Sequence, residues 1–275
     1  MSSNFIDNAH NSEHIMKNNI MKDDFNWEVP VEIVPLPSKG KVYDPNSLLY
    51  NLEKIKIKAM TATEEDILSS TSLIKSGTAI DQLLKSCLVN KNIDPSELIL
   101  GDRNALMISI RITGYGSDYP FNSKCEACNS LNENKIDLSD LEIKRLNIEP
   151  VQQGKNEFSL KLPVSKKTVV FKFLSEKDEK DRKVKNDFYK KMSSVKMERS
   201  VTSFLEASII SIDGITDKNK ITHFVKYMPA HDSRILRNYI NDNEPGIKMT
   251  QDIECKNCGH VNNVLIPINS NFFWP

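Results

Sequence analysis

Two pairs of cysteines carry the clearest chemistry in this chain of 275 residues. Cys125 and Cys128 lie in KCEACNS, and Cys255 and Cys258 lie in ECKNCGH. Each pair stands between two alternating segments, which is the pattern of a zinc knuckle at the tip of a hairpin. Two knuckles supply four sulfurs, the closed tetrahedral shell of a structural zinc. The sequence therefore predicts one zinc per chain, shared by Cys125, Cys128, Cys255 and Cys258.

Other interpretations of the cysteines are possible but less favoured. They include four unrelated buried cysteines, and a redox pair, although neither pair opens a helix as redox sites do. A catalytic zinc needs an open coordination position, which four sulfurs do not leave. His260 could replace a cysteine, but its position two residues after Cys258 favours a surface side chain. Cys87 falls on the apolar stripe of an expected helix and is predicted to lie in the core.

The long gap between the two pairs has a mechanical consequence. A shared ion ties position 125 to position 258, so the segment between them becomes an insertion clasped at its base. Because a metal that closes the fold adds its binding free energy to folding, we expect the metal-free protein to be markedly less stable.

Composition is that of an ordinary globular protein, with 39% hydrophobic and 27% charged residues. Basic and acidic side chains number 37 each, so the net charge is zero, whereas proteins that act mainly on phosphate backbones are usually basic. No apolar run approaches the roughly 20 residues of a membrane span. Residues 1–27 are polar and lack an apolar signal core, so we expect a disordered arm. The odd number of cysteines, 5, favours reduced thiols and the cytosol.

The elements that must position the cysteines are predicted from periodicity and turn residues, and together they indicate an α+β fold with a helical core and β hairpins. Residues 28–118 should form a proline-rich extended strap, a strand in KIKIKAM and three helices. One helix is expected over 64–74 after an N-cap at Thr63, a second after Thr78, and a third from a cap at Asp102 to a terminator at Gly114.

The rest of the chain is divided by the cysteine pairs. Residues 119–140 should form the first knuckle hairpin, and residues 247–275 the second hairpin with an aromatic tail. The two hairpins together are expected to form a discontinuous zinc-ribbon-like module. The inserted region 141–246 is expected to contain a hairpin at 157–174, a highly charged and solvated helix after it, a helix whose apolar stripe runs over 201–212, and helices at 217–227 and 231–241.

Residues with catalytic potential do not form a recognisable site. In HDSR, His231, Asp232 and Ser233 are consecutive, so they cannot form a triad, and Asp232 or Ser233 is expected to cap a helix. The segment GYGS has no lysine and follows a helix, which favours a turn over a phosphate loop. A protein without enzymatic activity is therefore expected. Acidic residues outnumber lysines around the first knuckle and balance them around the second, so nucleic-acid binding is not expected.

Several motifs, in their order along the chain, resemble the baseplate hub assembly protein (assembly chaperone) family of T4-like contractile-tailed bacteriophages. They are LPSKGKVY at 36–43, KAMTATEEDIL at 58–68, LIKSGTAIDQLLKSC at 73–87, GDRNALMISIRITGYGSDY at 101–119, MPAHDSRILRNYI at 228–240, and the terminal C-x-x-C-G with FFWP. The resemblance covers about 36–275. Asn129 stands where a glycine would follow the second cysteine of the first pair, and asparagine tolerates the left-handed conformation that such a knuckle can need.

The resemblance implies an assembly factor for the central hub of the tail baseplate, which contacts hub proteins in the cytoplasm of the infected bacterium. Two alternatives remain open. The protein could be a permanent structural subunit of the hub in the virion tail, or a zinc-ribbon regulator that binds nucleic acid. No membrane association is expected.

The aromatic tail is the candidate for partner binding. Phe272, Phe273, Trp274 and Pro275 follow the last expected strand, and aromatic anchors dominate the energy of interfaces. These side chains either dock on a hub protein or fold back onto the core of their own chain. We predict docking, because Pro275 ends the chain without an amide donor and leaves the aromatic side chains at a free tip.

Overall fold

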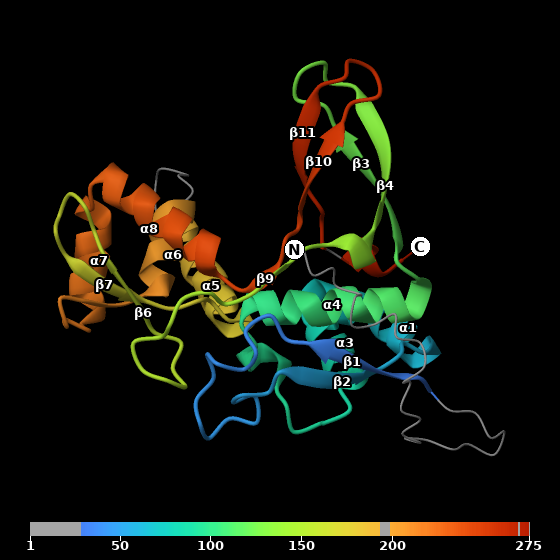
Figure 1. Ribbon diagram of the computed structural model, residues 1–275, viewed down its shortest axis with the longest axis horizontal. Coiled ribbons are helices and arrows are strands. Elements are labelled where there is room, and N and C mark those ends of the chain that lie inside the picture. Colours follow the sequence, from blue (N-terminus) through green and yellow to red (C-terminus); the bar gives the residue numbers. More distant parts are fainter. Residues whose placement is uncertain (1–28, 193–198, 269, 275) are drawn as a thin grey trace.

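A computed structural model provides the structure of the chain and describes residues 29–192, 199–268 and 270–274. The expected disordered arm, 1–27, lies outside the described residues. The fold is mixed α/β, with helices and several small antiparallel sheets. Figure 1 shows a central body around helix α4, a lobe to one side that contains α5–α8, and an arm of two hairpins that rises from the body.

The body begins with a two-stranded sheet that packs against helices. In the second strand, KIKIK, the two isoleucines Ile55 and Ile57 are buried and the lysines point outward, as the alternation predicts. The long helix Leu100–Tyr115, which comes after three shorter helices, is buried on almost every side and forms the centre of the core. The elements are β1 (Val31–Pro35), β2 (Lys54–Lys58), α1 (Ala62–Ser69), α2 (Thr71–Ser76), α3 (Ala79–Cys87), the 3-10 helix η1 (Pro95–Glu97) and α4 (Leu100–Tyr115).

The helix predicted over 64–74 with Thr63 as its cap is corrected to two helices. Thr61 caps α1 in a capping box with Glu64, whose carboxylate accepts hydrogen bonds from the Thr61 backbone N–H at 2.9 Å and hydroxyl at 2.6 Å. The chain then turns extended at Ser70, whose hydroxyl caps α2. Ser70 is thus a second good N-cap residue inside the predicted span, and it divides the predicted helix into α1 and α2.

Asp102 is not the cap of the third helix, and Gly114 is not its terminator. The helix α4 begins at Leu100 and ends at Tyr115, before Gly116 at φ 83°. Asp102 lies buried in the first turn, where it accepts hydrogen bonds from the Ser38 backbone N–H at 2.9 Å and from the Tyr43 hydroxyl at 2.7 Å. The carboxylate thereby holds the turns that follow β1, the segment predicted as a strap, against the core.

The lobe consists of a three-stranded sheet of order β6-β7-β8 with helices around it. The hairpin predicted at 157–174 and the helices predicted at 217–227 and 231–241 are confirmed. The elements are β6 (Phe158–Lys161), β7 (Thr168–Phe171), α5 (Glu176–Met192), α6 (Ser200–Ser208), β8 (Ile209–Ile212), α7 (Lys218–Tyr227) and α8 (Ala230–Asn243).

Two predictions within the lobe are wrong. The stripe over 201–212 is not one helix, because α6 ends at Ser208 and the isoleucine-rich segment Ile209–Ile212 pairs with β7 as an edge strand. Neither Asp232 nor Ser233 caps α8, which begins after Pro229. The buried Asp232 carboxylate instead accepts hydrogen bonds from the backbone N–H groups of Val164 and Ser165, each at 2.8 Å, and ties α8 to the β6–β7 turn.

The chain returns from the lobe to the body through a close contact between two glycines. The short strands β5 (Ile143–Lys144) and β9 (Gly246–Ile247) pair, and β9 crosses the start of α4. A Cβ atom on Gly101 would lie 1.7 Å from the Pro245 carbonyl oxygen, so no larger residue fits at this crossing.

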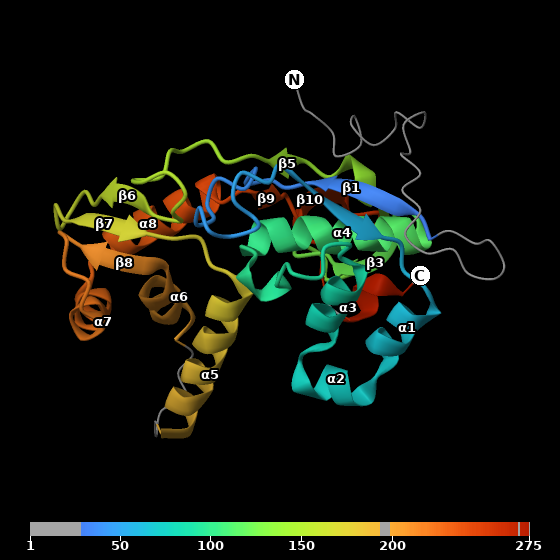
Figure 2. The same cartoon turned by 90° about the horizontal axis from the view of Figure 1, so that it is seen from below.

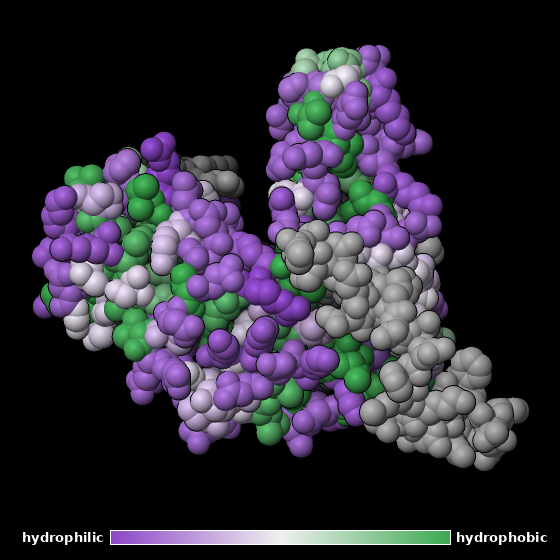
Figure 3. Space-filling view, in the orientation of Figure 1, coloured by the Kyte–Doolittle hydropathy of each residue, from purple (hydrophilic) through white to green (hydrophobic). Residues whose placement is uncertain are grey.

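The arm is built from two antiparallel hairpins that lie side by side although they are far apart in sequence (Figure 1). In the space-filling view the arm stands clear of the lobe, and its surface is largely hydrophilic with scattered hydrophobic residues (Figure 3). The elements are β3 (Asp118–Lys124), β4 (Leu131–Asp137) and the 3-10 helix η2 (Leu138–Asp140) in the first hairpin, and β10 (Thr250–Glu254) and β11 (Val261–Leu265) in the second. The 3-10 helix η3 (Ser270–Phe273) follows at the base of the arm.

Candidate metal centre

Each cysteine pair lies in a tight turn at the end of its hairpin. The backbone N–H of Asn129 donates to the Cys125 carbonyl at 3.0 Å, and that of Gly259 donates to the Cys255 carbonyl at 2.9 Å. Both of these donors have left-handed backbones, with φ 59° at Asn129 and 71° at Gly259. Asparagine thus adopts in the first turn the conformation that glycine provides in the second, as predicted.

The four sulfurs meet at the end of the arm. All four ligand atoms lie within 4.8 Å of one another, and the Cys125–Cys258 and Cys128–Cys255 sulfur pairs, which join the two knuckles, are each 3.7 Å apart. Four thiolates at the ordinary zinc–sulfur bond length of about 2.3 Å would form a tetrahedron with edges of about 3.8 Å. The prediction that the four cysteines form one cluster is confirmed, and the cluster could hold one metal ion.

The remaining candidates lie where the sequence predicted. Cys87 is fully buried in the core, and burial raises the pKa of its thiol to about 12. His260 is exposed, and its carbonyl accepts a hydrogen bond from the Cys255 backbone N–H at 2.8 Å. All the ligand atoms that the cluster brings together are therefore cysteine sulfurs.

Two buried asparagines, which the sequence analysis missed, cross-link the knuckles. Asn132 of the first hairpin accepts a hydrogen bond from the Lys256 backbone N–H at 3.1 Å, and its amide nitrogen lies 3.5 Å from the Cys255 sulfur. Asn262 of the second hairpin accepts from the Glu126 backbone N–H at 2.9 Å, and its amide nitrogen lies 3.7 Å from the Cys125 sulfur. Each asparagine thus steadies the opposite knuckle.

A signal for these asparagines was present in the sequence. Both pairs follow the pattern C-x-x-C-x-x-x-N, with Asn132 four residues after Cys128 and Asn262 four residues after Cys258. In a hairpin this offset returns the amide to the face of the sheet that carries the first cysteine of the pair. The repeated offset would have identified both residues as parts of the site.

Asn132→Ala and Asn262→Ala are each expected to weaken metal binding by about 10- to 100-fold, the usual effect of losing an outer partner of a metal ligand. Competition with a chromophoric chelator measures the change. Asn263→Ala is the matched control, since the Asn263 side chain is exposed and donates to Asp252 of the same hairpin at 2.6 Å. Equal affinities for all three variants would contradict a role of the two buried amides in the site.

Hydrogen bonds lower the pKa of two thiols in the cluster, those of Cys128 and Cys255. The Ser130 hydroxyl lies 3.0 Å from the Cys128 sulfur and 3.3 Å from the Cys255 sulfur, and it lowers the pKa of these thiols to about 7 and about 5. The backbone N–H of His260 acts to lower the pKa of Cys258, but sulfur neighbours, Cys128 first among them, raise it to about 12. A bound dication would relieve this crowding of negative charge and displace the remaining protons.

The arrangement is suited to a structural ion. A metal held by four sulfurs has no open coordination position for water or substrate. The ion would join residues 125 and 258 at the end of the arm. The expected metal clasp at the base of the inserted lobe is wrong, because the two ends of the lobe meet at the body, where β5 pairs with β9.

The aromatic tail does not form the free docking tip that the sequence predicted. Phe272 and Phe273 are 0% exposed, and the Phe272 ring packs against Tyr119 with centroids 5.0 Å apart. The buried Arg111 side chain donates to the Phe272 carbonyl at 3.0 Å. These two residues fold back onto their own core, because the end of α4 and the base of the arm offer an apolar socket with a donor for the tail backbone.

The other two tail residues differ from the phenylalanines. Trp274 is partly buried and lies 6.5 Å from the Tyr115 ring, measured between centroids, so a contact of Trp274 with a partner stays a prediction. Pro275 lies outside the described residues.

A family model described as T4 bacteriophage base plate protein matches residues 30–274. The chain belongs to this family. The matched range includes the body, the lobe, the arm with all four cysteines, and the buried phenylalanines of the tail. Neither the comparison with curated proteins nor that with solved structures found a match.

Membership of the family gives this protein a role in the base plate of a phage and implies contacts with other base plate proteins of the phage. Such a protein fits the cytoplasm of the infected bacterium or the virion tail. Within the described residues, none of the helices has the length and apolar character to cross a membrane.

Proposed function

We propose that this base plate protein is a non-enzymatic assembly factor, a chaperone, for the central hub of the baseplate, and that it acts through protein contacts in the cytoplasm of the infected bacterium. The single observation that carries the proposal is the family match over residues 30–274. The motif order shared with the hub assembly proteins supports the choice of the hub and of an assembly role.

The self-contained core supports an assembly factor over a permanent subunit of the hub. Interfaces of obligate subunits resemble a domain core cut in half, and they leave large apolar surfaces on the isolated chain. Here the largest buried side chains include Phe158, Phe171, Phe173, Phe272 and Phe273, all covered by the chain itself. A chain that completes its own core can exist free and make contacts that are later released.

The cofactor of the proposed function is one structural zinc per chain. Four sulfurs in a tetrahedral arrangement are a donor set that zinc prefers, since hard cations such as magnesium and calcium take oxygen ligands. The ion would hold the two hairpins of the arm as one rigid unit, which suits a surface that must keep its shape while partners are exchanged.

The engagement of the buried carboxylates supports a protein without enzymatic activity. Burial, the largest single influence, raises the pKa of Glu64. Hydrogen bonds from the Lys58 ammonium at 2.7 Å, from Ser86 and from Thr61 together outweigh burial and lower this pKa to about 2. Asp102 and Asp232 accept hydrogen bonds from distant turns. These acidic groups are structural partners and are not held ready for acid–base chemistry.

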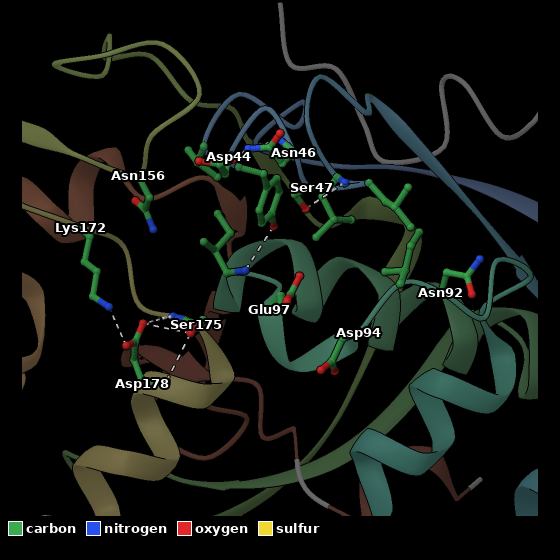
Figure 4. Close-up of a pocket in the computed structure, with 16 residues that line it drawn as sticks. Asp44, Asn46, Ser47, Asn92, Asp94, Glu97, Asn156, Lys172, Ser175 and Asp178 are labelled. Atoms are coloured by element: carbon green, nitrogen blue, oxygen red, sulfur yellow. Dashed lines mark hydrogen bonds and ion pairs between the residues drawn. The ribbon is translucent and has the colours of Figure 1, made fainter.

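The pocket drawn in Figure 4 has the same character. It encloses about 660 Å³ between the segment after β1, η1 and the start of α5. Its Asp178 lies in the first turn of α5 and accepts from the backbone N–H of Ser175, the residue before the helix, at 3.0 Å and from Lys172 at 2.6 Å, while Asp44 and Asp94 cap local turns. Asp44, Asp94 and Asp178, three of the acidic residues that line this pocket, are therefore engaged at the starts of turns and helices.

A nucleic-acid-binding regulator is disfavoured by the charge of the arm. Zinc ribbons that bind nucleic acid need basic side chains for the phosphates. The strands and turns of the arm carry more acidic than basic residues: Asp118, Glu126, Glu133, Asp137, Asp252 and Glu254 against Lys124, Lys135 and Lys256. The arm would repel a phosphate backbone.

Quantitative mass spectrometry of infected cells and of purified virions tests the proposal. We expect the protein to be abundant in infected cells and absent or far below stoichiometric amounts in finished tails. A phage that carries a stop codon in this gene should accumulate unassembled hub proteins. Stoichiometric presence in the virion would instead show a permanent hub subunit, and normal hubs in the stop-codon phage would contradict any role in hub assembly.

A further inference from the structure

Helix α5 exposes an apolar patch on a strongly charged helix. Figure 2 shows α5 running away from the body, so that its far end projects beyond α6. In this far half, Val184 is 69% exposed, Phe188 60% and Tyr189 45%. Val184 and Phe188 are four residues apart and share one face of the helix, and the Phe188 and Tyr189 rings lie 6.3 Å apart in an edge arrangement. We call the segment Arg182–Lys191 the α5 tip.

The opposite face of the α5 tip is anchored to the lobe. The Asn186 amide donates to the Ser203 hydroxyl of α6 at 3.0 Å, and Arg182 bonds to Glu179 and approaches Ser203 at 3.4 Å. The inner face of the helix is thus held in place. The exposed apolar side chains are therefore presented on a fixed support, and burying them against a partner would cost little ordering.

The α5 tip is also basic. It contains five basic residues, Arg182, Lys183, Lys185, Lys190 and Lys191, against the single acidic residue Asp187. The whole chain, in contrast, has equal numbers of acidic and basic residues. Positive charge is thus concentrated at the same end of the helix as the exposed apolar side chains.

A groove of about 530 Å³ adjoins the tip and is lined in part by Val184, Phe188 and Tyr189. The Arg199 guanidinium lies 4.2 Å above the Tyr189 ring, which fixes an aromatic platform at its edge, and Arg199 pairs with Glu206 at 2.6 Å. Lys185 and Lys218 are exposed at the groove.

We propose that the α5 tip and its groove dock an acidic segment of another base plate protein, one that places apolar side chains against Val184, Phe188 and Tyr189. The choice of occupant follows from charge complementarity, because a partner that covers the patch must approach through the surrounding lysines. Aromatic side chains beside basic ones are also the composition of interface anchors. The identity of the partner as a base plate protein rests on the proposed function.

Two other anionic occupants fit the patch less well. A phosphate backbone would satisfy the lysines but leave Val184 and Phe188 without an apolar contact. An anionic membrane would meet Asp187, the immediate neighbour of Phe188, and Asp181, about one turn before Val184. Helices that lie on membranes also carry a far larger apolar face. A protein segment can match both charge signs and the small apolar area.

Site-specific photo-cross-linking in infected cells tests the proposal on the full chain. A photoreactive phenylalanine analogue replaces Phe188, and in the control it replaces Tyr227, which is 67% exposed on α7. We expect the probe at 188, but not at 227, to cross-link to an acidic stretch of a base plate protein that mass spectrometry identifies. No cross-link at 188, or a cross-link to a basic or uncharged stretch, would overturn the proposal.

Titration calorimetry with the purified partner then measures its affinity for this protein and for the variants. Phe188→Ala and the combined change Lys183→Glu, Lys185→Glu and Lys191→Glu should each weaken binding at least tenfold, whereas Lys54→Glu with Lys56→Glu, on the exposed face of β2, should leave it within twofold. Unchanged affinity in the first two variants would contradict the assignment. Metal content and melting temperature verify that each variant is folded.

Two further probes separate the anionic occupants. Vesicles of phosphatidylglycerol and phosphatidylethanolamine, and a DNA duplex, should not bind the chain at physiological salt. If either of them binds, and the three lysine changes abolish that binding, the occupant of the patch is a membrane or a nucleic acid and the protein partner is excluded. The outcome is distinct from that of the proposed function. If the protein is stoichiometric in the virion and position 188 cross-links to an acidic segment, the docking inference holds and the assembly role is lost. If the protein is absent from the virion and position 188 does not cross-link, the assembly role holds and the docking inference is lost.

Discussion

Replacing Cys125 or Cys258 by serine is expected to abolish tight metal binding and to lower the free energy of unfolding by about 4 kcal/mol or more, the range in which loss of a structural metal falls. Either change breaks a cluster in which two sulfur pairs, each 3.7 Å apart, join the two hairpins. Without the ion, each hairpin of the arm is a two-stranded sheet, which is marginally stable by itself. Metal analysis and calorimetry measure the two effects.

The loss should be local at first. Amide hydrogen exchange is expected to accelerate in β3, β4, β10 and β11, while α4 in the body keeps its protection, because the core of the body does not contain the sulfurs. Removal of the metal with a chelator from the unmodified protein should reproduce the same pattern of exchange.

Cys87→Ser is the matched control for the metal. This cysteine is buried in the core, away from the cluster, so the variant should lose stability through a buried hydroxyl and still hold one metal per chain. Two metals per chain, or none in protein prepared under reducing conditions, would contradict a single site shared by the two pairs.

The second large effect concerns the tail. Phe272→Ala and Phe273→Ala are each expected to lower the free energy of unfolding by about 3–5 kcal/mol, because each removes a fully buried aromatic ring and leaves a cavity. For a chain of this size such a loss lowers the melting temperature by on the order of 10 °C. Deleting residues 270–275 should cost at least as much, since it also removes the Phe272 carbonyl that accepts from Arg111.

Phe188→Ala provides the comparison for the tail variants. The same change of side chain at a position that is 60% exposed should alter the melting temperature by no more than about 1–2 °C. If the tail variants melt together with Phe188→Ala and the unmodified protein, the phenylalanines are free in solution. The docking role predicted from sequence would then be restored.

The sequence by itself determined the features that depend on near neighbours. C-x-x-C spacing between alternating segments was enough to predict two hairpins that end in cysteine turns, and the left-handed tolerance of asparagine was enough to predict the backbone at Asn129. The alternation in KIKIK placed Ile55 and Ile57 inside. In each case the deciding interactions lie within a few residues, where spacing in the sequence is also spacing in the structure.

Tertiary structure decided which hydrogen-bond donors the potential helix-cap residues accept from. Asp102 and Asp232 have the chemistry of helix caps, and the sequence predicted that role for Asp102 and for either Asp232 or Ser233. Their carboxylates instead accept hydrogen bonds from Ser38 and Val164, which are 64 and 68 residues away. A carboxylate satisfies whichever unpaired N–H is brought to it in the core, and that donor cannot be found from local pattern.

The same limit explains the misassigned strand and the tail. Ile209–Ile212 continues a helical stripe, yet it became a strand because β7 offered an open edge for its backbone. Phe272 lies 161 residues from Arg111, the side chain that holds its carbonyl. The sequence could show that two phenylalanines must leave water, since burial of such a ring is worth about 1.5–3 kcal/mol. Only the tertiary structure decided which surface covers them, because the hydrophobic effect is non-directional and takes the apolar socket that the rest of the fold provides.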